Sequence, residues 1–279
     1  MRPFKVTSLS IALLVNFSLL FSNPLPQIQL PKKFTPKQDL TGWVMSEKLD
    51  GIRAIWNGKK LLSKNGNNLH PPRSFIKNFP PFMLDGELYS PELSFEKIQS
   101  IVLQDLPNPQ WRLLKYNLFE VPKAKGDFYS RMKKAKLWFE NHPNSTIYFI
   151  SQHPCMNHSN VTHFFNKIVK DRGEGIILKN ALLPYFSGRN SAIQKRKPIW
   201  DMEGEVIKIN PGKGKFKGMM GSVTLHLKNN ITFNLGSGFN LQERQNPPRI
   251  GNTITFRYHA LSKRGKPKFA SFLRIRKEE

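Results

Sequence analysis

Residues 48–53 read KLDGIR and place a lysine, an acid and an arginine around a single glycine. A lysine attacks an electrophile only when its amine is neutral, and the ordinary lysine pKa of about 10.4 leaves that amine charged at neutral pH. Nearby cations and a bound metal ion both favour the neutral amine. A glycine turn would let Lys48, Asp50 and Arg53 converge on one phosphate-sized site. The alternative is a charged, solvated hairpin turn.

Three later segments carry further residues of the types that bind nucleotides. Residues 84–88 (LDGEL) set two acids beside a glycine, where the edge of a sheet can meet a ribose or a metal ion. Residues 174–179 (EGIILK) put an acid at the mouth of an apolar strand. Lys195 and Lys197 share a face of an extended segment, where they can neutralise a phosphate chain. Each segment alone is also typical of a solvated surface.

The elements that position these segments mix strands and helices from about residue 30 to residue 200, without the regular alternation of a doubly wound fold. We expect strands at 43–45, 52–57, 113–121, 147–152 and 175–179, and helices at 129–141 and 161–171. Another helix should open at Pro91 with Ser90 as its N-cap. Its predicted buried side is Leu93, Ile98, Ile101 and Val102. Asn-Gly pairs at 57–58 and 65–66 indicate hairpin turns.

After residue 200 the sequence becomes rich in β-type runs, at 204–209, 222–227, 231–235 and 253–258. Glycine, proline and lysine turns separate them. Short strands of this kind predict a small barrel, and an OB-fold suits a protein that binds nucleic acid. We expect a hinge near residues 200–204 that lets this part swing.

The charge balance points to a polyanionic partner. The chain has 44 Lys and Arg against 19 Asp and Glu, a net charge of +25, and its 39% hydrophobic content is that of a globular protein. Like charges repel within a compact fold, so a polyanion would offset them. Nucleic acid is the commonest such partner. Adhesion to an anionic membrane is the alternative.

Cys155 is the only cysteine, so no internal disulfide forms. It lies between His153 and His158, a cluster that suggests a metal site. No fourth ligand follows nearby, and an ordinary loop is the better interpretation.

The N-terminus indicates export. Arg2 and Lys5 precede an apolar stretch from about residue 9 to residue 21, which is short for a bilayer span but suits a signal peptide. Ser22 is a small residue near a cleavage point, although no clean A-x-A site exists. A membrane anchor or an N-terminal helix is the alternative. Nothing later is apolar enough to cross a membrane, so we expect a soluble, monomeric, periplasmic or otherwise exported protein without a membrane partner.

Residues 212–218 (GKGKFKG) look like a phosphate loop but lack the G-x-x-x-x-G-K-[ST] pattern. We interpret them as a flexible basic turn in which Lys213, Lys215 and Lys217 follow a DNA backbone. A solvated hairpin is the alternative.

Taken together and in this order, KxDGxR, DGE, EGIILK and KxK followed by a β-rich tail resemble the covalent nucleotidyltransferases. These are the ATP-dependent DNA ligases, the RNA ligases and the mRNA capping enzymes. Residues 46–56, and Tyr185 followed by GRN at 188–190, look most like the minimal bacterial DNA ligases with export signals. The resemblance runs from about residue 30 to the C-terminus. It implies an α+β chain with a signal peptide (1–22), a nucleotidyltransferase domain of mixed sheets and helices (23–200) and an OB-fold β-barrel (204–279).

The resemblance also implies a reaction. Lys48 would attack the α-phosphate of ATP and form a phosphoamide with AMP, which then passes to a DNA 5′-phosphate before the 3′-hydroxyl attacks. Arg53 and Glu87 would hold the ribose, and Phe119 would stack on adenine. Mg²⁺ or Mn²⁺ would polarise the phosphoryl group while Lys195 and Lys197 stabilise its charge.

The residues that the resemblance assigns fall into four groups. The catalytic residues are Lys48, Asp50 and Arg53. The nucleotide-binding residues are Glu47, Arg53, Glu87, Phe119, Arg131, Lys195, Lys197 and Arg276. The metal ligands are Glu87 and Glu174. The nucleic-acid contacts are Lys64, Arg189, Lys213, Lys215 and Lys217.

Two positions depart from the family pattern. Lys64, in SKNG at 63–66, stands where the family has an arginine, so a point charge replaces a bidentate fork at a DNA phosphate. The chain stops three residues after Arg276, where many relatives carry another basic residue. In the family, the motif that contains Arg276 orients the pyrophosphate leaving group.

The sequence therefore predicts an ATP-dependent DNA ligase that seals nicks in duplex DNA. An RNA ligase of the same superfamily is the first alternative. A non-catalytic basic DNA-binding protein would explain the charge but would leave Lys48, Asp50, Glu87 and Glu174 without a role. A capping enzyme fits poorly with an export leader.

Overall fold

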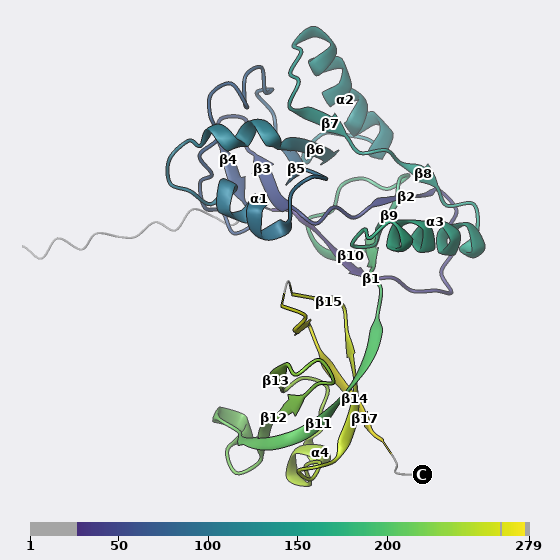
Figure 1. The fold of residues 1–279 in the computed structure, drawn as a ribbon. Coiled ribbons are helices and arrows are strands. Elements are labelled where there is room, and N and C mark those ends of the chain that lie inside the picture. The colour runs from purple at the N-terminus through teal and green to yellow at the C-terminus, as the bar shows by residue number, and fades with distance from the viewer. Residues whose placement is uncertain (1–26, 263, 277–279) are drawn as a thin grey trace, which may run out of the picture.

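The first part of the chain is built on two five-stranded sheets that face each other across the middle of the upper lobe (Figure 1). The computed structural model describes residues 27–262 and 264–276, and the predicted signal peptide at 1–22 lies outside them. The first sheet has the order β1-β10-β9-β2-β8. Its strands are β1 Gln29–Lys33, β10 Gly188–Arg196, β9 Ile176–Asn180, β2 Trp43–Glu47 and β8 His153–Pro154.

Helix α3 (His158–Lys170) covers the first sheet. Val161 and Phe165 on its buried side pack with Met45, Ile176 and Leu178 of the sheet. These side chains repeat at the helical spacing of four residues on α3 and at alternate positions on the strands, which is why both elements present one apolar face.

The second sheet has the order β4-β3-β5-β6-β7. Its strands are β4 Leu61–Ser63, β3 Ile52–Trp56, β5 Leu84–Tyr89, β6 Lys115–Glu120 and β7 Ile147–Phe149. Helices α1 (Phe95–Val102) and α2 (Phe128–Asn141) and the short 3-10 helix at Pro109–Leu113 pack their apolar sides on it. β1 with β10 and β6 with β7 are parallel pairs, and the other strand pairs of these two sheets are antiparallel. The expected mixed architecture, rather than a doubly wound sheet, is confirmed.

A third sheet, β13-β12-β11-β14-β17, forms the lower lobe. Its strands are β13 Thr232–Leu235, β12 Met220–His226, β11 Trp200–Pro211, β14 Thr253–Tyr258 and β17 Ser271–Ile275, with the short helix α4 (Leu241–Gln245) beside them. Within the described residues no ladder joins β13 to β17. The backbone N–H of Phe272 in β17 donates to Ser237 just after β13, at 2.9 Å, which brings these two edges together.

Residues 200–204, near which we predict a hinge, lie in strand β11. β11 is already continuous there, because Trp200 pairs with Tyr258 and Gly204 with Ile254. The chain leaves regular structure at residues 197–199, between β10 and β11. The apolar cores on the two sides of this linker share no residue.

A small hairpin of β15 (Ala260–Leu261) and β16 (Pro267–Lys268) reaches from the second domain toward the first (Figure 1). At its end the Nζ of Lys268 lies 3.5 Å from the Oε1 of Glu96 in α1. Next to the linker, the Nδ1 of His259 lies 2.8 Å from the carbonyl oxygen of Pro198. These contacts join the second domain to helix α1 and to the linker at residues 197–199.

Other predicted elements were displaced by a few residues. Helix α1 begins at Phe95 and not at Pro91, because Ser94 is the N-cap: its hydroxyl accepts from the backbone N–H of Lys97 at 3.3 Å. At the predicted cap, Ser90, the backbone carbonyl accepts a hydrogen bond from the backbone N–H of Leu93, which forms a turn before the helix. Ile98, Ile101 and Val102 are buried as expected. No helix of the described part of the chain is both long and apolar enough to cross a membrane.

Candidate active site

A cavity of about 700 Å³ lies where the two sheets of the first domain meet. Of the residues singled out in the sequence, those that line it are Glu47, Lys48, Arg53, Lys64, Asp85, Glu87, Phe119, Arg189, Lys195 and Lys197. They come from strands and adjoining turns that are far apart in the sequence and that the two sheets bring together. The sequence motifs therefore converge on one site.

Lys48 lies at the end of β2, where its backbone N–H donates to the carbonyl of Gly175 at 2.9 Å. Its ammonium forms an ion pair with Glu174, and Lys197 forms an ion pair with the other oxygen of the same carboxylate. The side chains of Lys48, Glu174 and Lys197 are 24%, 18% and 25% exposed, and of the three the two lysines line the cavity. Glu174 thus joins the candidate nucleophile to a candidate phosphate-binding lysine.

Two glycines are required by this arrangement. A Cβ on Gly51 would lie 2.3 Å from the carbonyl oxygen of Leu88. Gly175 has a φ of +139°, and a Cβ there would lie 2.2 Å from the carbonyl oxygen of Arg196. Close backbone contact at these positions explains why glycine follows Asp50 and Glu174.

Arg53 is held inside the protein rather than left free for a ligand. Its Nε and Nη2 donate to Asp85 at 2.9 and 2.5 Å, and its Nη1 donates to the carbonyl of Gln29 at 2.8 Å. Asp85 is fully buried. Of the two acids in residues 84–88, Asp85 orients Arg53 at the cavity, whereas Glu87 is the predicted ligand residue. The guanidinium also lies 5.3 Å from the ring centre of Phe119, so Arg53 supports that ring.

Phe119 is half-buried in the wall of the cavity, and Glu47 and Glu87 line the same space. An aromatic face beside carboxylates and ammonium groups offers a stacking surface for a base, acceptors for a ribose and cations for phosphates. The chemistry of the cavity thus matches a nucleoside phosphate.

Burial raises the pKa of Glu87 to about 8, against the lowering effect of Lys48 and Arg53. A carboxyl whose pKa is raised by folding destabilises the fold as it ionises, so its unfavourable contribution grows between its ordinary pKa of 4.5 and about 8. We expect Glu87→Gln to be more stable than the native chain by a margin that widens from pH 5 to pH 9. Thermal denaturation across that range measures it. A margin that stays constant with pH would contradict the assignment, and Glu140→Gln on the exposed side of α2 is the control.

Arg131 lies away from the cavity, and its predicted contact with nucleotide is wrong. It is 2% exposed and donates to both oxygens of Glu120, at 2.9 and 3.0 Å, and to the carbonyls of Gly126 and Leu183. Each of its three nitrogen atoms donates to a protein acceptor, and Arg131 does not line the cavity.

Lys179 is a cavity residue that the sequence analysis did not single out, although it ends the EGIILK segment. Its ammonium donates to Glu120 at 2.7 Å and to the carbonyl of Phe119 at 3.1 Å. Burial alone would raise the pKa of Glu120, but the charges of Lys179 and Arg131 lower it to about 2. Glu120, Lys179 and Arg131 therefore form a buried network of paired charges that holds the backbone of Phe119 in place.

The predicted nucleic-acid contacts divide between the two domains. Lys64 is exposed at the turn after β4 and lines the cavity with Arg189. Lys213, Lys215 and Lys217 are exposed on the turn between β11 and β12 of the second domain, which confirms a basic turn there.

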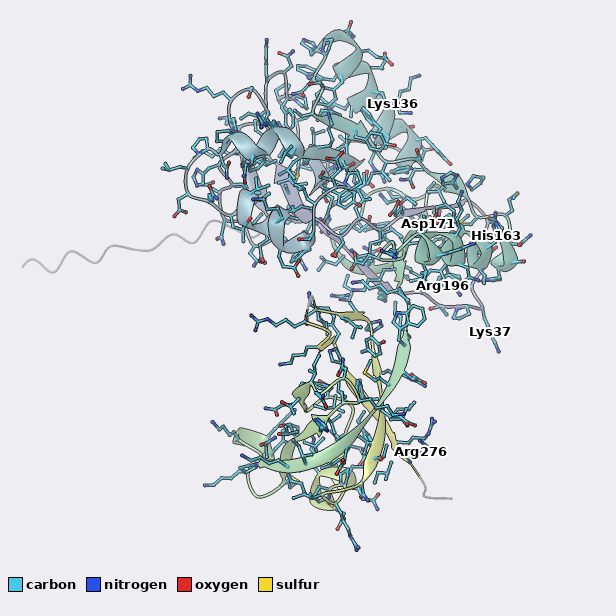
Figure 2. All side chains as sticks on the ribbon, viewed as in Figure 1. Lys37, Lys136, His163, Asp171, Arg196 and Arg276 are labelled. Carbon is cyan, nitrogen blue, oxygen red and sulfur yellow. The ribbon has the colours of Figure 1, made fainter. Side chains whose placement is uncertain are left out.

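Asp50 and Arg276 do not line the cavity. Asp50 is exposed on the turn that follows Lys48. Arg276 lies low on the second domain (Figure 2), where its Nη1 is 2.9 Å from Glu203. In this arrangement the second domain therefore does not bring Arg276 to Lys48.

The possible metal ligands in the site are carboxylates. Glu87 and Glu174 offer the hard oxygen donors that Mg²⁺ and Mn²⁺ prefer, although both oxygens of Glu174 are bonded to lysines. No group of three His, Cys, Asp or Glu side chains is gathered at a metal-ligand spacing anywhere in the described residues. His153, Cys155 and His158 accordingly do not form a metal site.

Known proteins with a similar sequence or fold are DNA ligases. A family model described as a DNA ligase OB-like domain matches residues 211–276. The DNA ligase of Haemophilus influenzae is 43% identical over 241 residues, which are 86% of this chain and 89% of that protein. A solved structure from a structure–function study of Lig E DNA ligases superimposes with a TM-score of 0.84 at 37% identity, covering 90% of this chain and 99% of that one. The adenylate form of Chlorella virus DNA ligase shares the fold, with a TM-score of 0.55 at 20% identity over 91% of this chain and 99% of that one.

Proposed function

The chain belongs to the DNA ligase family, and we propose that it carries out ATP-dependent nick sealing through AMP bound covalently to Lys48. The observation that carries this proposal is that Lys48 and Lys197 line one nucleotide-sized cavity and are both ion-paired with Glu174. A non-catalytic DNA-binding protein would have no use for such a set. Ligases of this fold have been solved as an adenylate and with ATP, in Chlorella virus and bacteriophage T7 respectively, which supports ATP as the nucleotide.

The first step forms a bond between the nitrogen of Lys48 and the α-phosphorus of ATP, and pyrophosphate leaves. Before this step Glu174 holds the ammonium of Lys48, so the ammonium must leave the carboxylate and give up a proton to solvent before the neutral amine can attack. Lys195 and Lys197 lie where they can neutralise the phosphates. Mg²⁺ or Mn²⁺, held by Glu87 and Glu174, would withdraw charge from the phosphoryl group.

In the second and third steps the AMP moves to the 5′-phosphate of the nick, and the 3′-hydroxyl then displaces it. Lys64 and Arg189 lie at the edge of the cavity, where they can hold the phosphates that flank the nick. Lys213, Lys215 and Lys217 offer a second set of cations on the other domain.

The test of this proposal has two parts. Intact-mass measurement after incubation with ATP and Mg²⁺ should show one added AMP, and the protein should then seal nicked DNA. Parallel substrates with the nick in duplex RNA address the alternative of an RNA ligase. Clear preference for RNA would overturn the proposed substrate, and absence of the AMP adduct would overturn the covalent mechanism.

Phe119 provides a prediction for base recognition. We expect Phe119→Ala to raise the ATP concentration needed for half-maximal AMP attachment by roughly 5- to 150-fold, since stacking on an aromatic ring contributes about 1–3 kcal/mol per base. Phe119→Tyr should restore most of the affinity because it keeps the ring. A titration of the adduct against ATP measures this. Tyr129→Ala, which removes a 54% exposed ring elsewhere, is the control, and equal effects at the two positions would contradict the assignment.

We also propose that the mature chain acts outside the cytoplasm as a monomer, with domains at 23–200 and 204–279. The basic, then apolar, N-terminal sequence supports export. The separate apolar cores on either side of residues 197–199 support the division into domains. Fusion of residues 1–26 to a reporter that is active only after export tests the localisation.

A further inference from the structure

A second hollow of about 910 Å³, here named the basic groove, lies on the first domain. Its charged lining residues are all cationic: Lys59, Lys60, Lys123 and Lys134. All four are exposed, and across residues 27–262 and 264–276 none of them forms an ion pair with an acid. Four like charges around one hollow repel each other, so an anion is the ligand that would stabilise them.

The basic groove adjoins the active cavity along several chain segments. In each of five short segments, one residue lines the cavity and a near neighbour in the sequence lines the groove. With the cavity residue given first, these pairs are Gln29 and Gln27, Arg53 and Ile55, Ser63 and Leu62, Asp85 and Met83, and Glu120 and Val121. Each pair is one or two residues apart. Two residues of a strand span roughly 7 Å, which is about two base-pair steps of DNA. Five of these ten residues are buried, whereas Ser63 and Leu62 are both partly exposed next to the exposed Lys64. A nucleic-acid backbone that passes Lys64 can therefore continue into the groove along this edge strand.

The lysines of the groove are presented by fixed backbone. The side chain of Asn57 accepts from the backbone N–H groups of Lys59 and Lys60, at 3.0 and 2.8 Å, and so shapes the turn between β3 and β4. Lys123 holds a φ of +66°, a conformation that side chains with a Cβ rarely adopt. The Nζ of Lys134 lies 4.4 Å from the ring centre of Phe82, which lines the groove as well. The cations are thus spread over three segments in defined positions.

We propose that the basic groove binds the phosphate backbone of duplex DNA on one side of the nick. The proposal extends the ligase function argued above and rests on it. Charges spread over three segments fit a row of phosphates better than a single small anion. Contacts of this kind hold the duplex in place and carry no base sequence information.

The test uses the fourfold variant Lys59→Ala, Lys60→Ala, Lys123→Ala and Lys134→Ala. Attachment of AMP should be unchanged, because none of these residues lines the active cavity. Binding to a nicked duplex, measured with Lys48→Ala added so that no reaction occurs, should become less salt-dependent. Each phosphate contact contributes about 0.9 to the slope of log K against log salt, so the slope should fall by about 2–4. Lengthening the duplex on one side of the nick should strengthen binding of the chain with an intact groove and not of the variant.

A matched control removes the same charge elsewhere, through Lys133→Ala, Lys167→Ala, Lys170→Ala and Lys228→Ala, all of which are exposed and line neither hollow. An equal fall in slope in this control would show that only net charge matters and would overturn the proposal. An unchanged slope in the groove variant would overturn it too, as would a fall in slope with no dependence on duplex length, which indicates a small-anion site. If the native chain formed no AMP adduct, the covalent mechanism would be overturned. That result would leave the proposal for the basic groove standing, because DNA binding is measured in chains that form no adduct.

Discussion

Replacing Lys48 with alanine is expected to abolish both the AMP adduct and the sealing of an ordinary nick. The variant removes the only atom that we assign to bond with the α-phosphorus, and removal of a nucleophile typically lowers the rate by about 10⁴-fold or more. Intact-mass spectrometry measures the adduct, and a gel assay measures sealing. Retention of the adduct in Lys48→Ala would show that another residue is the nucleophile.

A pre-adenylated nick separates the roles of the site. When AMP is already on the DNA 5′-phosphate, sealing needs only the attack of the 3′-hydroxyl, so Lys48→Ala should keep much of this activity. Lys197→Ala is the informative companion, because it removes a phosphate-binding cation and leaves the nucleophile in place. We expect it to slow the formation of the adduct without eliminating it. A Lys48→Ala chain that is also inactive on the pre-adenylated nick would point to a damaged fold, which circular dichroism would detect.

The sequence predicted the motifs of the site better than their connections. Lys48, Glu87, Phe119, Lys195 and Lys197 all line the cavity, because side-chain alternation and the glycine turns determine locally which way they face. Pairing partners depend on contacts between segments far apart in the chain. No local pattern shows how such segments meet.

The pairing of buried charges is the clearest example. Arg131 was predicted to contact the nucleotide because it follows the aromatic segment around Phe119. In the structure it instead donates to both oxygens of Glu120. Asp85, next to the predicted ligand residue Glu87, accepts two hydrogen bonds from Arg53, and no local pattern indicated that pairing. A buried charge must be paired, but the sequence does not show which charges are buried. The sequence also did not indicate how the two domains are arranged, and in that arrangement Arg276 lies away from Lys48.

Replacing Glu120 with alanine is expected to destabilise the first domain strongly. The change leaves the charges of Arg131 and Lys179 buried without a counter-charge, and these side chains are only 2% and 7% exposed. Breaking a buried pair in this way costs about 3–5 kcal/mol. At roughly 2–4 °C per kcal/mol, the melting temperature of this domain should fall by about 6–20 °C. Differential scanning calorimetry measures the change.

The triple variant Glu120→Leu, Arg131→Met and Lys179→Met separates lost charge pairing from lost packing. It replaces the whole network with apolar side chains, and such replacements of a buried ionic group are often neutral or stabilising. We expect it to recover most of the melting temperature. It should also bind ATP less well, because the bond from Lys179 to the carbonyl of Phe119 is absent. A triple variant as unstable as Glu120→Ala would mean that shape, and not charge, governs this site.

The pH dependence follows from the direction of the pKa shift. Folding lowers the pKa of Glu120 from 4.5 to about 2, so its ionised form stabilises the fold. That contribution is fully present above pH 4.5 and is lost as the pH falls toward 2. The difference in stability between the native chain and Glu120→Ala should therefore be constant from pH 5 to pH 8 and should narrow below pH 4.5. Glu87 behaves in the opposite sense, since folding raises its pKa to about 8. The two carboxyl groups therefore have different roles. Glu120 stays charged at neutral pH and holds the wall of the cavity through its ion pairs. Glu87 stays largely neutral until a bound cation or nucleotide favours its ionised form.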